Sequence, residues 1–537
     1  MSAVYRDQLA ETLNVALVRQ GLDFSVTEIH LERPANLEHG DWSSNVALAF
    51  AKKLGLNPRE LAQRIIDEVS LDLPSHVEAI EVAGPGFINF RLKDSWLHEV
   101  LSLVISLGEQ GYARSDEGIG KSVNLEFVSA NPTGPLHAGG GRWGAYGDAL
   151  TRLFKRQGYT TFTEYYVNDR GVQTELFGAS LAARRDGLAP PEDGYQGEYV
   201  SEWANEMPED ADPVVWGKQR AMADVSRSLE SMNVLFDMWA SEQSLVESGA
   251  MDEIIEMLRK SKWTEERDGA TWLRTSEFGD EKDRVLIKSD GEPTYFLPDI
   301  AYHHSKFSRG DHVIDILGAD HHGYVARMSA AMQMLGHPKE SYEAIIGQNV
   351  TLIRHGEEVR LSKRTGTMVE VRELVEAVGP DMARFAYLLQ SIDTRQTIDI
   401  DALSKKANEN PVFYVQYAHA RIAAVAREAV NRGVGRQDLS LVDTSVLVEK
   451  RELELLRVIS LLPEVSDLAL RERSPHKVST WVRELAASFH GFYHDCPILR
   501  SDVAAETQQA RLWLVEAARI ALAIGLDLLG VSAPEEM

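Results

Sequence analysis

The sequence predicts an α/β protein: a doubly wound parallel sheet forms the core, a small α/β domain precedes it, and an α-helical bundle follows it. Three observations predict this fold class. A strand, a glycine turn, a helix and a second strand follow one another within residues 121–168. Strand and helix patterns alternate to about residue 375, and only helical patterns continue beyond it. Such alternation is typical of a parallel sheet covered by helices, and a run of apolar-faced helices is typical of a bundle.

Composition excludes several classes of protein. The 537 residues suffice for about three domains, and 44% hydrophobic with 26% charged residues is ordinary for a globular chain. A single cysteine, Cys496, excludes an internal disulfide framework and a cysteine-rich zinc site. No apolar run approaches the ~20 residues of a membrane span, and no leader pattern is visible. We therefore expect a cytoplasmic protein without a membrane partner.

The net charge of −26 alone counts against a nucleic-acid partner, because phosphate binding is electrostatic. Local basic faces can still bind RNA in an acidic protein. Each small basic cluster in this chain also has the ordinary interpretation of a solvated surface.

The first domain is predicted to span residues 1–112. Ala10, Leu13 and Leu17 lie on one face of an amphipathic helix, and a Gly-Pro-Gly break precedes a strand at residues 87–90.

The central domain is predicted to span residues 113–375, with a polar, largely helical insertion at about 170–270. Residues 160–167 are rich in Thr, Tyr and Phe, as strands are. Another strand at residues 312–317 ends in the polar cluster 318–322. Ligands of a doubly wound sheet lie at the carboxyl ends of its strands, so this cluster is expected to face the site.

The turn before the first helix of this domain has the composition of a phosphate-binding loop. It reads Asn131-Pro-Thr-Gly-Pro-Leu-His137-Ala-Gly139-Gly140-Gly141-Arg142. Its glycines let backbone N–H groups approach a phosphate at the helix N-terminus. His137 stands at the mouth of the turn, where an imidazole can donate to developing negative charge. Glycine turns before helices are common, so the turn alone is weak support for a nucleotide site.

A second motif lies far downstream. Residues 349–353 and 358–361 are predicted to form a hairpin that delivers Ser362, Lys363 and Arg364 on a loop. A loop lysine is usually only a solvated side chain. The hairpin and the glycine turn together favour a cation that binds departing phosphate groups.

The last domain is predicted to span residues 376–537. Leu455, Leu456, Ile459 and Leu462 fall on one helical face, and a densely apolar helical tail follows. The domain is predicted to be an α-helical bundle.

The two motifs together resemble the two signatures of class I aminoacyl-tRNA synthetases, which have a Rossmann-like catalytic core. The first departs from the pattern at Gly140, where a second histidine is usual, and the second at Arg360 and Arg364. Within this class the flanking residues resemble arginyl-tRNA synthetases. The segments that carry this resemblance are His39–Asp41, Asn131–His137, Tyr165–Asp169, Phe236–Trp239, Gly318–Tyr324, Asn410–Arg421 and Leu528–Met537.

The resemblance implies an arginine–tRNA ligase. Such an enzyme activates L-arginine with ATP to arginyl-adenylate, usually only with tRNA bound, and transfers arginine to the 2′-hydroxyl of the terminal adenosine of tRNA(Arg). His137 and Lys363 are the implied catalytic residues. The implied ATP contacts are His137, Gly139, Gly140, Ser362, Lys363 and Arg364. Mg²⁺ would arrive on the ATP phosphates, because the sequence contains no dedicated carboxylate cage.

Gly140 removes one donor from the motif, and losing such a donor can cost roughly 3 kcal/mol. Either another backbone amide or Arg142 is expected to compensate, and Gly140→His is expected to be tolerated.

Selection of arginine needs a carboxylate that pairs with a planar guanidinium. By resemblance, Tyr295 and Asp299 hold the guanidinium, with Tyr302 on the same helical face. The alternative for Asp299 is a helix cap. The rest of arginine would contact Glu126, Ser129, Asn131, Asp320 and His321.

The resemblance also implies contacts with tRNA. His39 and Asn45 would approach the corner of the RNA, although a turn and helix capping explain this stretch equally well. Tyr414, Gln416, Tyr417 and Arg421 could stack and pair with anticodon bases, although core packing is the alternative.

Three further expectations complete the interpretation. No metal site is expected, because the His303-His304 and His321-His322 pairs lack further ligands at suitable spacing. The family suggests a monomer. The rival hypothesis is a catalytically impaired, synthetase-like RNA-binding or regulatory protein, which Gly140, Arg360 and Arg364 favour.

Overall fold

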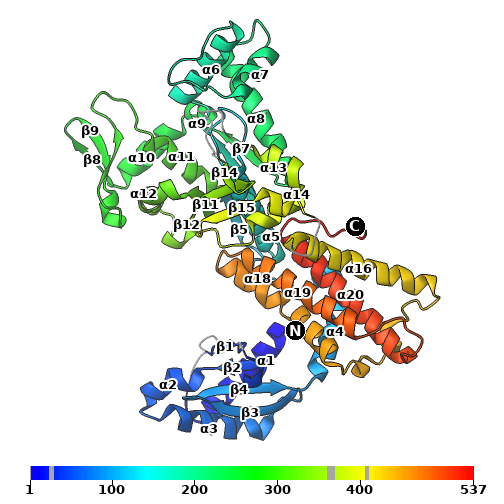
Figure 1. Ribbon diagram of the computed structural model, residues 1–537. Coiled ribbons are helices and arrows are strands. Elements are labelled where there is room, and N and C mark those ends of the chain that lie inside the picture. Colours follow the sequence, from blue (N-terminus) through cyan, green and yellow to red (C-terminus); the bar gives the residue numbers. More distant parts are fainter. Residues whose placement is uncertain (1, 23–28, 35, 360–368, 406–409) are drawn as a thin grey trace.

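The computed structural model describes residues 2–22, 29–34, 36–359, 369–405 and 410–537. The chain forms an elongated molecule in which an N-terminal α/β unit, a helical bundle and a larger α/β region follow one another (Figure 1). In the described ranges, no helix is long and apolar enough to span a membrane.

The N-terminal unit is an antiparallel sheet covered by helices. Its strands lie in the order β1-β2-β4-β3. Ala10, Leu13 and Leu17 are buried, as the amphipathic pattern predicted, and the strand expected at 87–90 is the inner strand β4. The elements are α1 (Ser2–Arg19), β1 (Leu31–Glu32), β2 (Trp42–Ser44), α2 (Val46–Leu54), α3 (Pro58–Val69), β3 (Val77–Ala83) and β4 (Phe87–Leu92).

Helix α4 (Ser95–Gly111) packs with a different region from the one expected, because the predicted domain division grouped it with the N-terminal unit. Its principal partners are helices α17 (Lys450–Ser460) and α20 (Ala505–Leu528) of the C-terminal bundle. Its apolar face, from Trp96 to Val104, is buried. The helix therefore packs with a part of the chain more than 300 residues away, which local periodicity cannot reveal.

The central sheet has five parallel strands in the order β12-β11-β5-β6-β7. The chain passes outward from β5 to β7 on one side and then returns to add β11 and β12 on the other. The strand order therefore reverses between β5 and β11, where a doubly wound sheet binds its ligands. The strands are β5 (Ser122–Glu126), β6 (Thr160–Val167), β7 (Met238–Ser241), β11 (His312–Gly318) and β12 (Tyr342–Gly347).

This topology confirms the predicted fold class and includes strands that were missed, among them β12 of the central sheet. Edge strand β7 lies inside the stretch expected to be a helical insertion. Strand β15 (Gln396–Asp399) pairs with β13 (Val350–Arg354), although strands were not expected after residue 376. Strands β7 and β15 have four residues each, too few for a clear alternation. The predicted hairpin forms between β13 and β14 (Glu357–Val359).

The remaining elements surround the central sheet. Helices α6 to α8 have a core of their own at the far end of the molecule (Figure 1). The strand expected near Arg284 belongs to a separate antiparallel sheet, β10-β9-β8, not to the central one. These elements are α5 (Ala138–Arg156), α6 (Val172–Arg185), α7 (Glu198–Glu206), α8 (Pro213–Ser231), α9 (Glu242–Glu247), α10 (Ala250–Lys260), β8 (Thr264–Arg267), β9 (Ala270–Leu273), β10 (Arg284–Ile287), α11 (Phe296–Lys306) and α12 (His322–Met334).

Helices dominate the C-terminal region, as expected. Leu455, Leu456, Ile459 and Leu462 are all fully buried in its core. Its elements, with the connecting helices before it, are α13 (Val371–Val378), α14 (Pro380–Tyr387), α15 (Ile400–Leu403), α16 (Pro411–Asn431), α17, α18 (Leu462–Arg471), α19 (His476–Asp495) and α20.

Candidate active site

A cavity of about 840 Å³ lies at the carboxyl ends of β5 and β11, where the strand order reverses. It brings together many of the residues singled out in the sequence. Its lining includes Glu126, Ser129, Asn131, His137, Gly140, Asp299, Tyr302 and His321.

His137 is the N-cap of helix α5, and this fixes what its imidazole can do. Its Nδ1 accepts a hydrogen bond of 3.0 Å from the Gly140 N–H. An accepting Nδ1 in a neutral ring leaves the proton on Nε2. His137 therefore presents an N–H donor at the mouth of the cavity, beside the positive end of the helix dipole.

Gly140 lies within the first turn of α5. A Cβ at this position would come 2.7 Å from Cδ1 of Leu136, which is fully buried. A histidine at 140 therefore requires Leu136 to move.

The suggestion that Arg142 reaches phosphate groups is wrong. Its side chain is buried and donates to the carbonyls of Gln348, Ser391 and Thr394, at 2.7 to 2.9 Å. Arg142 instead joins the first turns of α5 to the segments that precede strands β13 and β15.

The segment that follows the hairpin returns directly to the histidine turn. The N–H of Ala138 donates to the Val369 carbonyl at 2.8 Å, and the N–H of Val371 donates to the Leu136 carbonyl at 2.9 Å. Backbone hydrogen bonds therefore join the first motif to the residues that come shortly after the second motif in the chain. Ser362, Lys363 and Arg364 lie outside the described residues.

Asp299 lies in the first turn of α11 and lines the cavity. Burial, together with the nearby carboxylates of Glu242 and Glu126, raises its pKa to about 6. The positive charge of His303 and a hydrogen bond from Tyr324 act in the opposite direction. A partly buried carboxylate of this kind is suited to a cationic ligand, whose charge would offset the desolvation.

Tyr295, by contrast, is not brought into the cavity. It is the N-cap residue of α11, and its side chain is 84% exposed. Tyr302, two turns further along, lines the cavity and donates from its hydroxyl to Glu164 Oε2 at 3.1 Å.

Glu126, Ser129 and Asn131 follow one another around the end of β5. The Ser129 hydroxyl donates to Glu126 Oε1 at 2.8 Å, and Asn131 donates to Gln173 Oε1 at 3.2 Å. Ser129 has φ of 39°, in a region that non-glycine residues rarely adopt. Such strain is often retained where a side chain must be held at a functional site. The Asp320 side chain lies outside the description.

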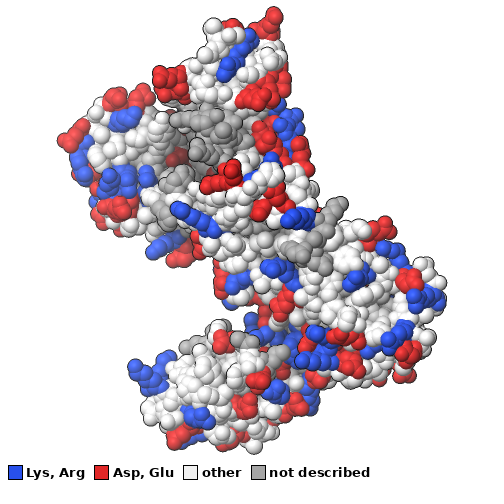
Figure 2. Space-filling model, viewed as in Figure 1, with Lys and Arg blue, Asp and Glu red and all other residues white. Residues whose placement is uncertain are grey.

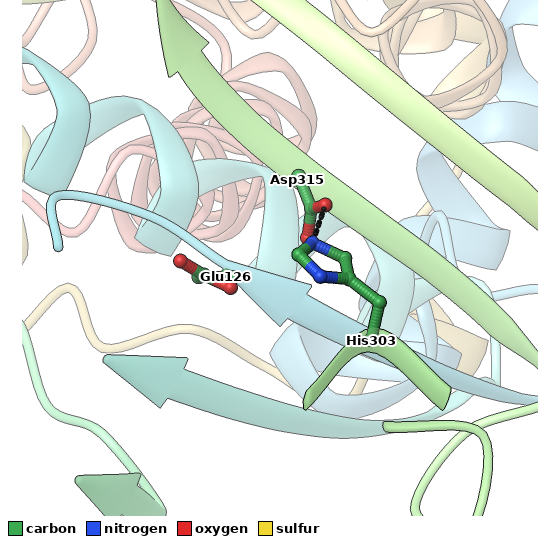
Figure 3. A group of neighbouring side chains, drawn as sticks. All are labelled: Glu126, His303 and Asp315. Carbon is green, nitrogen blue, oxygen red and sulfur yellow. Dashed lines mark hydrogen bonds and ion pairs between the residues drawn. The ribbon is translucent and has the colours of Figure 1, made fainter. Parts of the chain in front are cut away.

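A buried charge cluster adjoins the cavity, and two of its members, Glu126 and His303, belong to the cavity lining. Glu126, His303 and Asp315 come from β5, α11 and β11, and one ligand atom from each lies within 4.8 Å of the others (Figure 3). This spacing would suit a metal ion, which the sequence did not predict. The ammonium of Lys306, however, contacts both carboxylates, so a metal would have to displace a buried cation.

Lys306, Tyr324 and Glu242 were not proposed as site residues from the sequence. Lys306 is fully buried, and Glu242 is 9% exposed with a pKa raised by burial. Ionisable residues are rarely buried without a partner, but burial is visible only in the folded chain.

Three of the four residues expected to contact the anticodon share one face of α16. The guanidinium of Arg421 lies 4.6 Å from the Tyr417 ring and 4.9 Å from the Tyr493 ring, and Tyr414 packs on His490. Stacked rings and an arginine make a suitable platform for single-stranded bases.

The fourth residue, Gln416, is placed differently. It is 6% exposed, and its amide donates to Asp381 and Ser532 at 2.7 to 3.2 Å, so it anchors the C-terminal tail. His39 and Asn45 of the N-terminal unit are exposed.

Basic side chains are scattered among acidic ones over the face shown in Figure 2. The net charge of −26 is thus distributed without one dominant basic patch on this face.

Sequence families cover three parts of the chain. Residues 4–92 match the arginyl tRNA synthetase N terminal domain, residues 198–423 the catalytic domain of class I (R) tRNA synthetases, and residues 415–537 the DALR anticodon binding domain. An arginine–tRNA ligase of Kineococcus radiotolerans is 44% identical over 100% of this chain and 99% of its own length. One of Frankia alni is 43% identical over 99% of each.

Solved structures agree. A putative arginyl-tRNA synthetase from Campylobacter jejuni superposes with a TM-score of 0.75 at 33% identity, covering 83% of this chain and 100% of its own. The arginyl-tRNA synthetase of Thermus thermophilus reaches a TM-score of 0.80 over 99% of both chains, and its 22% identity shows the fold alone.

Proposed function

Because the chain belongs to the arginyl-tRNA synthetase family and is an arginine–tRNA ligase, we propose that the cavity at the β5–β11 edge is where it activates arginine. The observation that carries this assignment is the convergence of two groups on one cavity: the partly buried carboxylate of Asp299 and the Nε2–H of His137. One group suits a guanidinium, and the other suits a phosphate.

The first reaction is an in-line displacement. The arginine carboxylate attacks the α-phosphorus of ATP, an acyl-phosphate bond forms, and pyrophosphate departs. Such chemistry depends mainly on positioning and on stabilising negative charge. His137 Nε2–H would donate to the phosphate oxygens, and backbone amides at Gly139 and Gly140 would contribute the positive end of α5. Mg²⁺ would accompany the ATP phosphates, and Ser362, Lys363 and Arg364 would bind the leaving group.

Arginine selection rests on carboxylates. Asp299 would pair with the guanidinium, and Glu242, the carboxylate that helps to raise the Asp299 pKa, would add negative potential. Glu126, Ser129 and Asn131 would receive the α-ammonium end. A neutral side chain would leave the buried charge of Asp299 unpaired, which is why a single site can discriminate strongly.

The second reaction transfers the arginyl group to the 2′-hydroxyl of the terminal adenosine of tRNA(Arg), with AMP as leaving group. Tyr414, Tyr417 and Arg421 would stack with anticodon bases, and the exposed His39 and Asn45 would approach the body of the RNA. We expect the protein to act as a monomer and to need tRNA for activation. The non-catalytic alternative receives no support from the relatives, which are arginine–tRNA ligases that align with this chain over 99% of their own length.

The deciding experiment is arginine-dependent exchange of pyrophosphate into ATP, with and without tRNA(Arg). Lysine, glutamine and cysteine serve as control amino acids. Exchange with arginine alone among these, and only when tRNA is present, is the expected result. Exchange without tRNA would contradict the coupling, and exchange with a control amino acid would contradict the pocket.

A further inference from the structure

Three acidic residues occupy one row of the central sheet. Glu126 of β5 is in register with Asp315 of β11 on one side and with Glu164 of β6 on the other. Residues in register on neighbouring strands point to the same face of a sheet. Asp315 and Glu164 are fully buried and Glu126 is 7% exposed. Like charges side by side are destabilising, so this row needs cations.

Helix α11 and the turn after it supply those cations. The Lys306 ammonium, itself fully buried, contacts both Glu126 Oε2 and Asp315 Oδ1. Arg309 pairs with Glu164. Burial lowers the pKa of Lys306, but the carboxylates of Asp315 and Glu126 outweigh burial, and the net shift is upward.

His303 is the third cation. Its Nδ1 lies 2.7 Å from the Asp299 carbonyl and its Nε2 lies 2.7 Å from Asp315 Oδ2. Both partners can only accept, so both ring nitrogens must carry protons. Burial lowers the pKa of His303, but the Asp315 carboxylate raises it by more. The net shift of the His303 pKa is therefore upward, in agreement with an imidazolium.

The charged groups of this sheet row and of helix α11 suit a cationic ligand such as arginine. Among the residues described here, Glu126, Asp315, Glu164 and Asp299 are acidic, and Lys306, His303 and Arg309 are cationic. These groups leave one negative charge in excess, and Glu242, the second carboxylate near Asp299, has a cation of its own nearby in Arg170. Arginine brings two cationic groups, its guanidinium and its α-ammonium.

We propose that Lys306 is a positioning residue for the α-ammonium of arginine, acting through Glu126. Its ammonium holds Oε2 of Glu126 in the interior, so that Oε1 is left beside Ser129 at the cavity wall. This inference rests on the proposed role of the cavity, and in particular on Glu126 receiving the α-ammonium. Lys306 itself does not line the cavity. The ring of Tyr302, which comes from the same helix and does line the cavity, lies 4.6 Å from the Lys306 ammonium.

The experiment compares two arginine analogues as inhibitors of arginine-dependent pyrophosphate exchange by the full-length protein with tRNA. Agmatine keeps the amine and the guanidinium but lacks the carboxylate. 5-Guanidinopentanoate keeps the guanidinium and the carboxylate but lacks the amine. In Lys306→Met we expect the inhibition constant of agmatine to rise about thirtyfold or more, as for truncating one partner of a buried charge pair. The constant for 5-guanidinopentanoate should change less than about threefold, because Asp299 still binds its guanidinium. Lys306→Arg should restore agmatine binding in large part.

Two further variants keep the test decisive. Glu126→Gln removes the same charge pair with an isosteric side chain, and it should weaken agmatine selectively even if Lys306→Met folds poorly. Arg511→Met removes a buried cation from a comparable pair with Glu452 in the helical bundle. Arg511→Met should lower thermal stability without changing the ratio of the inhibition constants of the two analogues.

Equal weakening of both analogues by Lys306→Met, or unchanged agmatine binding, would overturn the positioning role. If the wild-type protein shows no arginine-dependent exchange, the proposed function fails instead. If the wild-type protein exchanges but Glu126→Gln weakens both analogues equally, Glu126 does not receive the amine and the inference fails alone.

Discussion

At the scale of single residues, the site depends on the protonation of two side chains. His137 must keep its proton on Nε2 to donate, and its cap bond to Gly140 ensures that it does. Asp299 must be ionised to attract a guanidinium, and its burial works against ionisation.

This conflict at Asp299 predicts a pH dependence. Its pKa of about 6 in the ligand-free protein means that the carboxylate form, which we propose binds arginine, is dominant above that pH and lost below it. The KM for arginine should therefore be level above about pH 7 and rise about tenfold for each unit below pH 6. Pyrophosphate exchange between pH 5 and 8 measures this, and the KM for ATP serves as the internal control. A KM for arginine that stays level to pH 5 would contradict the assignment.

The two roles of His137, donor and helix cap, can be separated by substitution. Asparagine is a good N-cap residue but places no donor where Nε2 lies. His137→Asn should therefore lower kcat by roughly 100-fold or more with little change in melting temperature. His137→Ala should lose kcat similarly and also about 1 kcal/mol of stability with the cap. Steady-state kinetics and thermal melts distinguish the two variants. Full activity in His137→Asn would show that the imidazole donor is unnecessary.

At the scale of elements, helix α5 approaches the sheet closely because it carries glycines on its inner face. A Cβ at Gly147 would lie 2.2 Å from the ring of Phe127, which is fully buried at the end of β5. A Cβ at Gly144 would lie 3.1 Å from Cδ2 of Leu229, the end of a flexible side chain. The position of His137 relative to the sheet thus depends on residues two to three turns further along its helix.

Gly147→Ala should cost about 1–3 kcal/mol, because the helix or the Phe127 ring must move. Gly144→Ala is the matched control. There the gain in helix propensity, about 1 kcal/mol, offsets a contact that can relax. Urea denaturation of both variants gives the comparison. Equal stability of the two would mean that α5 is not held close to β5 by Gly147.

At the scale of the whole molecule, buried arginines join the separate regions. Arg384 of α14 donates to the carbonyls of Met232, Asn233 and Leu529 and pairs with Asp148 of α5. It thereby connects the end of α8, helix α5 and the C-terminal tail. The N-terminal unit is attached to the bundle by ion pairs, Arg457 with Asp41 and Arg33 with Glu464.

Arg384→Met should lower the free energy of unfolding by roughly 3–5 kcal/mol, as expected when one partner of a buried charge pair is removed. Arg384→Lys keeps the charge but cannot reach all of the carbonyls, so it should recover only part of the loss. Arg471→Met, which breaks an exposed pair with Asp467, should cost less than about 1 kcal/mol. Chemical denaturation compares the three variants. A loss in Arg384→Met no larger than in Arg471→Met would contradict the connecting role.

The sequence predicts features that depend on near neighbours. The glycine turn at His137, the alternating strands and the β13–β14 hairpin are each encoded within a few residues. The pairing of α4 with α20 and the short strands β7 and β15 depend on distant partners or on too few residues. The same holds within the site: Asp299 was predicted by resemblance, whereas Lys306 gains meaning only where three strands place their carboxylates in one row. Tyr295 has the predicted spacing but faces solvent, because helical periodicity does not fix which residue begins the helix.

Arg142 and Arg384 have one more consequence. Each is held by several backbone carbonyls, a geometry that only a guanidinium can satisfy. In a cell that relies on this enzyme for its arginyl-tRNA, every new copy of the chain is translated with the enzyme's own product. A pocket that accepted lysine would insert lysine at these two sites in its successors and weaken them. The selectivity of the cavity at β5 and β11 for arginine therefore affects the stability of the enzyme molecules that are synthesised next.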